Sequence, residues 1–405
     1  MTVLKIAFRN VFRQKRRSIL TALSMFGGFV LAAFFIGWAD GTYNNIIDTF
    51  TRNNLGHVQV HEKTYLDRSA IYKTINNLPE IEKVLQNTKK VTAWTPRLFS
   101  AGLVSVKDKS AGTRIIGIDP EKEVRTTKFD EKIIQGRMLA KNPAHEVVLG
   151  KGLAKILKAQ IEDEIVVLSQ GADGSIANDM YKIVGILDSG DEISDRAAFY
   201  LHLTDARELL VLEGRVHEIA VTVKHLGDVG RVVKALQAKI DDPRLAVEPW
   251  QVFARSFYVA MNADKEGMWI MLVVIVLVVA VGVLNTVLMS VLERRREYGV
   301  LKAVGTRPGQ IIKMVLAEVN ILAVVCVLAG AAVGLLLNYL LSIHGITLPD
   351  PISYGGMQFQ QMQAEINARS FYIPAITILF VATFVSLFPA FKAARTDPAR
   401  SMRIH

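Results

Sequence analysis

The sequence is short of the residues that build disulfide-linked scaffolds and soluble enzymes. It has 405 residues, one cysteine, and charged side chains at only 21% of its positions. The lone thiol of Cys326 has no partner within the chain, so an intrachain disulfide is excluded. So little charge beside 51% hydrophobic residues also argues against a disordered chain and against a soluble enzyme.

The sequence also lacks the motifs of common catalytic and nucleotide-binding sites. It contains no Gly-x-Ser-x-Gly, no His-Glu-x-x-His and no Gly-x-x-x-x-Gly-Lys-Ser/Thr. His57 and His61 are four residues apart, but the alternation over 56–61 predicts a strand, where four residues span about 13 Å and cannot share one metal ion. We therefore expect no catalytic residue, metal ligand or cofactor site in this chain.

Four long uncharged runs stand out instead, of 22, 26, 31 and 22 residues. Roughly 20 helical residues cross a bilayer core of ~30 Å, so each run is long enough to span a membrane. The first run is too long for the apolar core of a signal peptide and precedes no Ala-x-Ala site, so we expect it to remain as an anchor. The predicted spans are residues 18–40, 268–292, 318–341 and 370–391.

The net charge of +10 is distributed so that it predicts the orientation of these spans. Residues 1–17 carry +6, residues 293–318 carry +3 and the tail 392–405 carries +3, whereas residues 41–267 are neutral. Basic segments on one side of a membrane are the positive-inside signal, which differs from a nucleic-acid-binding face. We therefore expect both termini and the 293–317 segment to be cytoplasmic, with residues 41–267 and the short loop 342–369 outside.

Residues 41–267 predict a large α+β domain inserted between the first and second spans, because strand-like and helical segments alternate along it. Turns at Gly136 and Gly214 indicate an inserted subdomain at about 136–214. The expected strands are 56–61, 91–106 as one strand or as two with a break at Thr95-Pro96, 113–118, 147–150, 164–168, 181–187 and 219–223. The expected helices are 75–85, 151–158, 204–212 and 229–240. The predicted fold class is an α-helical membrane protein with four transmembrane helices and this extracytoplasmic domain.

The basic N-terminal segment, residues 1–17, has an amphipathic pattern. Leu4, Phe8 and Val11 share one helical face, and basic residues share another. This pattern predicts an interfacial helix lying on an anionic membrane surface, with a simple basic flank as the alternative.

Residues 293–317 predict a short charged helix between two spans. Tyr298, Leu301 and Val304 form a narrow apolar stripe, Gly305 is suited to end the helix, and Pro308 is suited to begin the next one. Such a helix either docks onto a cytoplasmic partner or is a solvated connector.

Pairs of small residues four apart occur in two spans. They are Gly28 with Ala32 in the first span and Gly330 with Gly334 in the third. Small residues at this spacing let helix backbones approach closely, so we expect one of these pairs to lie at a contact between spans.

Several segments resemble the FtsX-like ABC transporter permeases, the family that includes lipoprotein-releasing and macrolide-exporting permeases. Residues 293–310 resemble its signature E-[RK]-x-R-E-[IY]-G-[VI]-L-[KR]-A-x-G-x-x-x-x-Q, and residues 388–403 resemble its closing P-A-x-[KR]-A-[AS]-x-x-D-P-x-x-[AS]-[LM]-R. Residues 6–10 and 14–17 resemble its opening. The external stretches 146–154 and 184–190 resemble the lipoprotein-releasing branch, so the resemblance extends over nearly the whole chain.

The resemblance implies a non-catalytic permease of the bacterial inner membrane with a periplasmic domain. Its partners would be two ABC ATPase subunits that bind ATP and Mg, a second identical or related permease chain, membrane lipid, and a lipoprotein or other hydrophobic cargo, without nucleic acid. ATP-driven closure would be passed through the spans to the periplasmic domain. The implied ATPase-coupling residues are Glu293, Arg294, Arg295, Arg296, Glu297, Tyr298, Leu301, Lys302 and Gly305.

Two other functions remain open at this stage. One is an FtsX-like signal transmitter that activates a periplasmic cell-wall hydrolase, although family members of that kind have much smaller external domains. The other is a membrane-anchored sensor without transport, which the coupling signature disfavours. The loop 342–369 is longer than expected for lipoprotein-releasing members, so the sequence leaves the cargo undecided.

The expected topology can be tested with single cysteines at Ser175 and Thr306 in a Cys326→Ser background. A membrane-impermeant thiol reagent applied to intact cells should label the cysteine at position 175 and not the one at position 306, because only the first lies outside. Labelling at position 306 from outside would show that the orientation is wrong.

Overall fold

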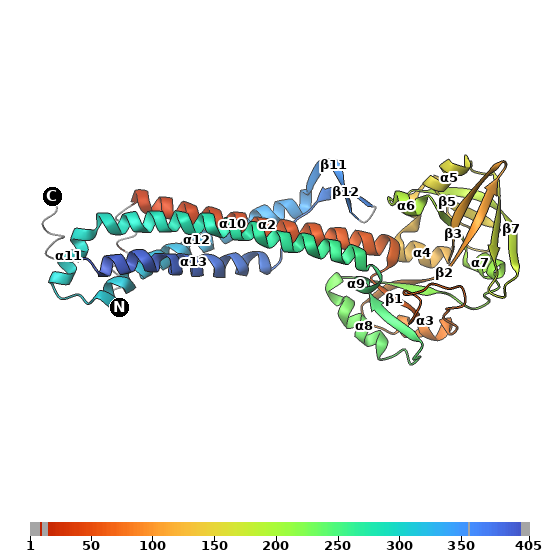
Figure 1. The fold of residues 1–405 in the computed structure, drawn as a ribbon, viewed down its shortest axis with the longest axis horizontal. Coiled ribbons are helices and arrows are strands. Elements are labelled where there is room, and N and C mark those ends of the chain that lie inside the picture. The colour runs from red at the N-terminus through yellow and green to blue at the C-terminus, as the bar shows by residue number, and fades with distance from the viewer. Residues whose placement is uncertain (1–8, 10–14, 355–356, 398–405) are drawn as a thin grey trace. The chain divides into compact units, whose positions relative to one another are not determined.

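The computed structural model describes residue 9, residues 15–354 and residues 357–397 (Figure 1). Most of the predicted interfacial helix, residues 1–17, and the last part of the tail lie outside the described residues. The chain divides into two compact units. The helical unit comprises residues 1–43, 262–347 and 361–405, and the sheet unit comprises residues 44–261 and 348–360.

Among the residues that the structure describes, four helices are long and apolar enough to cross a membrane. All are longer than the apolar runs that predicted them: α2 continues past Asp40, and α10 begins well before residue 268. A charged side chain ends an apolar run without interrupting backbone hydrogen bonds, so the helix continues. The long helices are α2 (Lys15–Phe50), α10 (Arg255–Glu293), α12 (Pro308–His344) and α13 (Arg369–Ala394), and the short α11 (Arg295–Ala303) lies between two of them in the sequence.

Close approach of α2 to its neighbours depends on small residues. A Cβ atom added at Gly28 would overlap the side chain of Val279 on α10, and one added at Gly330 of α12 would come within 2.8 Å of Phe29. Gly334 lies against Ala33 in the same way. Ala32 is buried beside Leu272. The small residues of both predicted pairs thus face other helices of the same unit.

One polar side chain lies inside the apolar core of the helical unit. Asn338 on α12 is fully buried, and its Nδ2 donates a hydrogen bond to the carbonyl oxygen of Ala33 at 3.1 Å. Gly37 makes this contact sterically accessible, because a side chain there would overlap the Asn338 carboxamide. The bond gives the buried Asn338 Nδ2 an acceptor among apolar side chains, whereas its Oδ1 has no partner within the described residues.

The sheet unit is built on one ten-stranded mixed sheet, in the order β10-β1-β9-β2-β3-β8-β5-β7-β4, with β6 pairing both β2 and β7. The pairs β3–β8 and β5–β7 are parallel. The strands are β1 (Val58–Glu62), β2 (Val91–Val106), β3 (Lys109–Ile118), β4 (Ile133–Gly136), β5 (Glu146–Gly150), β6 (Glu164–Gln170), β7 (Ile176–Leu187), β8 (Ala198–His202), β9 (Glu218–Val223) and β10 (Leu245–Pro249).

Short helices precede, connect or follow these strands. They are the π-helical turn η1 (Thr51–Leu55), α3 (Leu78–Gln86), α4 (Pro120–Thr127), η2 (Phe129–Lys132), α5 (Lys151–Leu157), α6 (Glu192–Asp195), α7 (Leu203–Leu210), η3 (Leu226–Asp228), α8 (Val229–Gln237) and α9 (Trp250–Phe253). Local sequence accounts for their ends. Asp119 caps α4 by accepting a hydrogen bond from the Lys122 N–H, and Pro120 occupies the first helical position, which needs no N–H partner.

Of the two alternatives for 91–106, the single strand is correct: β2 is continuous at Thr95-Pro96, and its pairing with β3 starts only at Arg97, so the missing N–H of Pro96 costs no bond to β3. The strands of the predicted subdomain, 136–214, belong to the same sheet as the rest of the unit, because β8 pairs β3 and β6 pairs β2. Within the loop 342–369, strands β11 (Ile346–Tyr354) and β12 (Met357–Met362) form a two-stranded sheet that the sequence left unassigned.

The contact at Gly28 generates a test with a neighbouring control. Gly28→Leu should destabilise the helical unit by about 1–3 kcal/mol, because the new side chain overlaps Val279. Gly27→Leu should be tolerated, because nothing lies within 4 Å of a Cβ at that position. Thermal unfolding of the detergent-solubilised variants compares the two. Equal melting temperatures would mean that this close contact does not support the bundle.

Candidate functional site

The short helix α11 has defined boundaries on both sides. Arg294 adopts φ −92° and ψ 14°, which interrupts helical geometry between α10 and α11. Gly305 has φ +97°, and two hydrogen bonds close the helix end, from Gly305 N–H to the Lys302 carbonyl and from Thr306 N–H to the Leu301 carbonyl. This is a Schellman ending, in which glycine is favoured. Pro308 then begins α12, so the predicted helix end at Gly305 and the predicted helix start at Pro308 are both confirmed.

Arg294 fastens the beginning of α11 to α12. Its Nη1 lies 2.8 Å from Oε2 of Glu318, and its Nε donates to Glu297 at 2.8 Å. The guanidinium also lies over the ring of Tyr298, 5.3 Å from the ring centre. Only 7% of Arg294 is exposed, so the carboxylates compensate a charge that has little access to water. Removing one partner of such a buried pair typically costs about 3–5 kcal/mol.

Lys302 fastens the other end of α11 to α13. Its Nζ donates hydrogen bonds to the carbonyl oxygens of Ala394 at 3.1 Å and Thr396 at 2.8 Å. These carbonyls lie at the C-terminal end of α13, where helical geometry leaves them without N–H partners and where a cation is favoured. The short helix is therefore tied to both α12 and α13.

The predicted apolar stripe does not form one exposed face. Tyr298 is only 1% exposed and belongs to the core of the helical unit, together with Val291 and Ile311, and Leu301 packs against that core. Burial raises the pKa of Tyr298, which keeps its hydroxyl uncharged. Val304 is instead 82% exposed. The interpretation of Tyr298 and Leu301 as a docking face is thus not supported, because the chain's own helices cover them.

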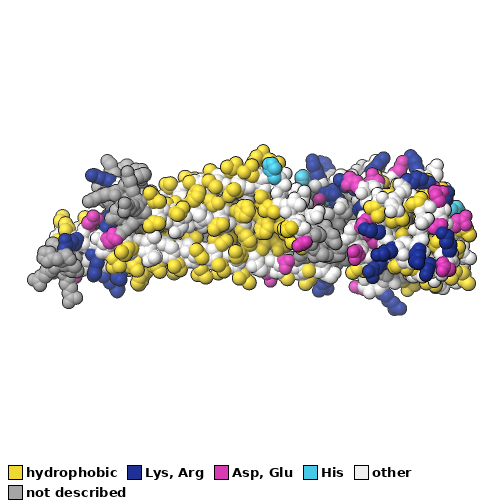
Figure 2. All heavy atoms as spheres, turned by 90° about the horizontal axis from the view of Figure 1, so that it is seen from above, with side chains coloured by type: hydrophobic (Ala, Val, Ile, Leu, Met, Phe, Trp, Pro, Cys, Tyr) yellow, Lys and Arg dark blue, Asp and Glu magenta, His cyan; other side chains and the backbone are white. Residues whose placement is uncertain are grey.

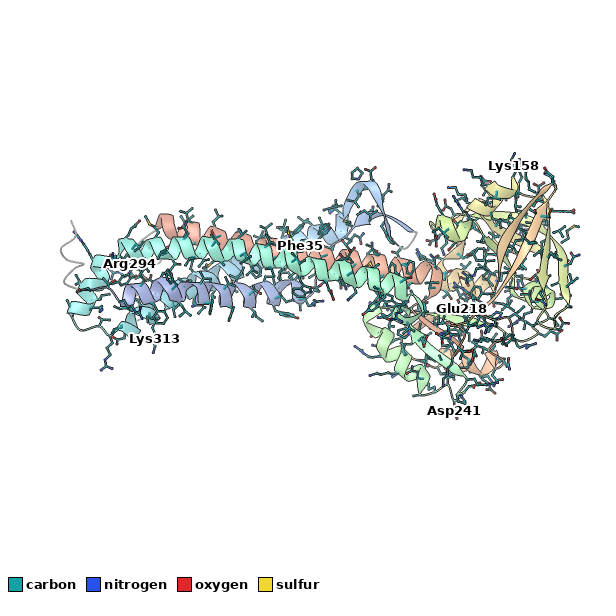
Figure 3. All side chains as sticks on the ribbon, viewed as in Figure 1. Phe35, Lys158, Glu218, Asp241, Arg294 and Lys313 are labelled. Atoms are coloured by element: carbon teal, nitrogen blue, oxygen red, sulfur yellow. The ribbon has the colours of Figure 1, made fainter. Side chains whose placement is uncertain are left out.

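A different face of α11 is available to a partner. Val300 is 51% exposed, and Val304 lies one turn further along the same helix edge. Arg295 and Arg296 are exposed beside them, as is Glu293 at the end of α10. On the face that Figure 2 shows, hydrophobic side chains gather over the middle of the helical unit. The labels in Figure 3 place Arg294 and Lys313 near one end of this unit. The exposed valines and arginines form what we call the α11 face: Arg295, Arg296, Val300 and Val304.

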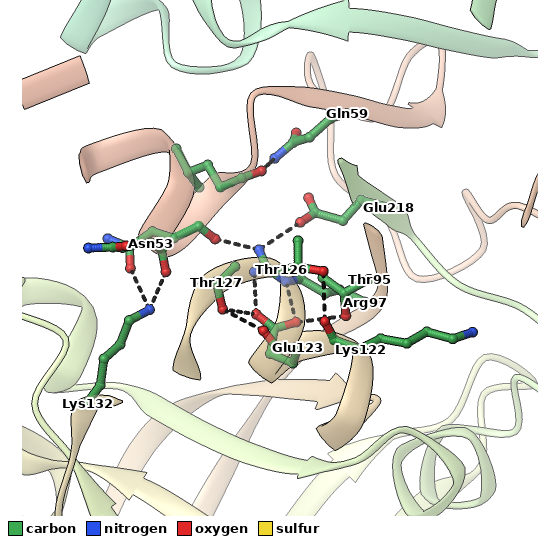
Figure 4. A network of polar contacts seen from close by, with 12 residues as sticks. Asn53, Gln59, Thr95, Arg97, Lys122, Glu123, Thr126, Thr127, Lys132 and Glu218 are labelled. Atoms are coloured by element: carbon green, nitrogen blue, oxygen red, sulfur yellow. Dashed lines mark hydrogen bonds and ion pairs between the residues drawn. The ribbon is translucent and has the colours of Figure 1, made fainter. Parts of the chain in front are cut away.

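A second polar cluster lies in the sheet unit (Figure 4). Arg97 on β2 is buried and contacts Glu123 of α4 through Nη2 at 2.5 Å and Glu218 of β9 through Nη1 at 3.3 Å. Its Nη1 also donates to the carbonyl oxygen of Asn54 at 2.6 Å. Burial favours the neutral form of Glu123, but the Arg97 guanidinium outweighs it and holds the pKa of that carboxyl below its ordinary value. The cluster ties η1, which follows α2, to the sheet.

Sequence reasoning missed the partners in both clusters. Glu318 was counted only as one charge in a basic segment, although a carboxylate directly before the apolar run that starts at Val319 is a signal for a buried partner. Arg97 is the one charged residue of β2, and Glu218 is the one charged residue of β9, which is a similar signal. No group of three or more potential metal ligands occurs among the described residues.

The described residues form four membrane-length helices, a short helix bound to two of them and a separate mixed-sheet unit. This combination defines a polytopic membrane protein with a large domain outside the lipid. Two protein families match the sequence. The MacB-like periplasmic core domain matches residues 18–239, and the FtsX-like permease C-terminal domain matches residues 269–398. The chain belongs to the family that combines these domains, and it is an ABC transporter permease of the LolC and MacB type.

Individual relatives are distant. The lipoprotein-releasing system transmembrane protein LolC of Neisseria meningitidis is 22% identical over 78% of this chain and 79% of the relative. An uncharacterized ABC transporter permease of Methanocaldococcus jannaschii is 24% identical over 99% of this chain and 97% of the relative. The macrolide export ATP-binding/permease protein MacB of Campylobacter jejuni is 24% identical over 98% of this chain, but only 60% of that protein is covered.

Among solved structures, the periplasmic region of MacB from Actinobacillus actinomycetemcomitans covers 52% of this chain and 97% of its own length, with 14% identity and a TM-score of 0.38. The extracellular domain of the transporter YknZ covers 47% of this chain and 98% of its own length, with 11% identity and a TM-score of 0.36.

The two faces of α11 can be separated by substitution. Val304→Asp should reduce co-purification of the ATPase several-fold while the chain keeps its thermal stability, because the position is exposed. Tyr298→Asp should instead destabilise the chain itself by about 2–5 kcal/mol, because it places a charge in the core. Arg295→Ala, which removes one exposed charge, should change binding by only ~0–1 kcal/mol. Unchanged ATPase co-purification with Val304→Asp would exclude the α11 face as the docking surface.

Proposed function

We propose that this chain is the permease subunit of an ABC transporter in which separate ATPase subunits supply the energy and the sheet unit acts on cargo. ATP and Mg would bind to those partners, two ATPase copies serving two permease chains. The observation that carries the proposal is α11: it is fixed to α12 and α13 by Arg294 and Lys302 and still exposes Val300 and Val304. A force applied to the exposed face of α11 would therefore be transmitted to α12 and α13.

The proposed orientation follows the charge distribution. Both termini and α11 lie in the cytoplasm, where the ATPases are, and the sheet unit lies in the periplasm, inserted between the first and second spans of a protein of the bacterial inner membrane. The basic segments support this orientation through the positive-inside rule. Chain continuity supports the route of coupling: the unit boundaries at residues 43 and 261 fall inside α2 and α10, so no loop separates span from sheet unit at either place.

The proposed cargo is a lipoprotein or another hydrophobic molecule that is extracted or exported from the inner membrane. The names of the relatives support this cargo class, because they include a lipoprotein-releasing protein and a macrolide exporter. The second candidate is an FtsX-like transmitter that activates a periplasmic cell-wall hydrolase. The ten-stranded sheet unit favours the first candidate, since the transmitter members of the family have much smaller external domains.

The assembled complex in nanodiscs distinguishes these functions through its ATPase rate. A lipoprotein should stimulate ATP hydrolysis several-fold if lipoprotein is the cargo, and a small amphiphile should do so if the complex exports drug-like molecules. Lipoprotein lacking its acyl chains is the matched control and should leave the rate unchanged. Stimulation only by a purified cell-wall hydrolase would replace transport with the transmitter function.

A further inference from the structure

A cavity of about 300 Å³ lies within the sheet unit. Its floor comes from four strands that are neighbours in the sheet, β9, β2, β3 and β8. Its other walls come from the end of α2 with η1, from α4 and η2, and from the segment that carries α6. The cavity therefore depends on segments spread over residues 50–218, and its size is within the range of small-molecule sites.

Strand register places the floor residues on one face of the sheet. Arg97 pairs with Glu218 across β2 and β9, and Phe99 pairs with Ile116 across β2 and β3. Ile116 pairs in turn with Tyr200 on β8. Directly paired residues point to the same side, so one row of the floor runs from a carboxylate and a guanidinium through apolar side chains to a phenol.

The lining carries three cationic side chains, Arg97, Arg114 and Lys132, and three carboxylates, Glu123, Asp191 and Glu218. Glu123 and Glu218 both bind Arg97, and Asp191 accepts hydrogen bonds from the N–H groups of Ile193 and Ser194. Arg114 and Lys132 form no ion pair among the described residues: the Arg114 guanidinium lies over the Phe99 ring at 4.5 Å, and Lys132 Nζ donates to the carbonyl oxygen of Asn53 and to Oδ1 of Asn54. Burial lowers the pKa of Lys132 to about 8, so an anion beside it would stabilise its charged form.

Further groups give the cavity a shape and a directional donor. The hydroxyl of Tyr200, which lines the cavity, makes no hydrogen bond within the described part of the chain. Aromatic rings of Phe50, Phe99, Phe129 and Tyr200 form its apolar walls. The Phe129 and Tyr200 rings meet edge to face, 4.8 Å apart. Two cations, one hydroxyl donor and flat apolar walls are complementary to an anionic head on a planar apolar body.

We propose that this cavity is a binding site for a small organic anion with an aromatic or similarly flat apolar body, held by Arg114, Lys132 and Tyr200. The site is separate from α11 and does not depend on the transport proposal. Because Asn53, Asn54 and Leu55 also line the cavity, a bound anion contacts the turn that follows α2. Occupancy should therefore stabilise that turn.

The test uses the full chain in nanodiscs of zwitterionic lipid, with 3-phenylpropanoate as the probe and empty nanodiscs subtracted. Equilibrium dialysis of the labelled probe should show saturable binding of one molecule per chain. The isosteric neutral 3-phenylpropanamide should bind at least tenfold more weakly, because it lacks the charge. Hydrogen exchange at residues 50–55 should slow on binding, which would place the probe in this cavity.

Variants assign the binding to the named residues. Arg114→Gln should weaken probe binding at least tenfold, and Tyr200→Phe should weaken it about threefold. Arg231→Gln is the matched control, since its side chain is 75% exposed on α8 and does not line the cavity. Melting temperatures check that each variant is folded. Phosphatidylglycerol that displaces the probe would support the site and identify a lipid headgroup as the source of the anion.

Three results would each overturn the proposal. The first is the absence of saturable binding up to 10 mM probe. The second is equal affinity for the acid and the amide, which would reveal only an apolar patch. The third is unchanged affinity in folded Arg114→Gln.

Discussion

The buried charge of Arg294 has to be compensated, and this requirement determines how α10, α11 and α12 are arranged where they meet. A guanidinium that is 7% exposed needs its carboxylates in place, so the end of α10, the start of α11 and the Glu318 region of α12 have to meet around it. Tyr298 fills the space beneath the guanidinium and extends the contact into the core. Consequently α11 is part of the bundle, and its exposed residues lie on a helix that is fixed to the other helices.

The sequence predicted the four long helices and both ends of the turn after α11, but not the full length of the long helices or the covered face of α11. Runs of apolar residues, the glycine that ends α11 and the proline that begins α12 act locally, so their effects can be read directly from the chain. Periodicity shows that Tyr298 and Leu301 share a helix face, but it does not show whether a partner or the same chain covers that face. The chain's own helices cover that face, because Arg294 binds Glu318, which is distant in sequence.

In the sheet unit the strands were predictable and their partners were not. Alternation identified most strands, whereas the order of the sheet depends on pairings between distant segments, such as β3 with β8. Proline lacks an N–H, so the sequence left a break at Pro96 as one of two alternatives, and only the register shows that β3 does not need that N–H. The cavity is the clearest case: its floor brings together residues from four strands, and no local pattern contains that information.

The hydrogen bond between Asn338 and Ala33 has a consequence for how the spans can move. Sliding α12 along α2 would separate Asn338 Nδ2 from the Ala33 carbonyl, and it would drive the carboxamide away from the space that Gly37 provides. Tilting the helices about the bond keeps it intact. The contact between Asn338 and Ala33 therefore acts as a pivot. We expect α12 to rotate against α2 during the conformational changes of this permease and not to slide along it.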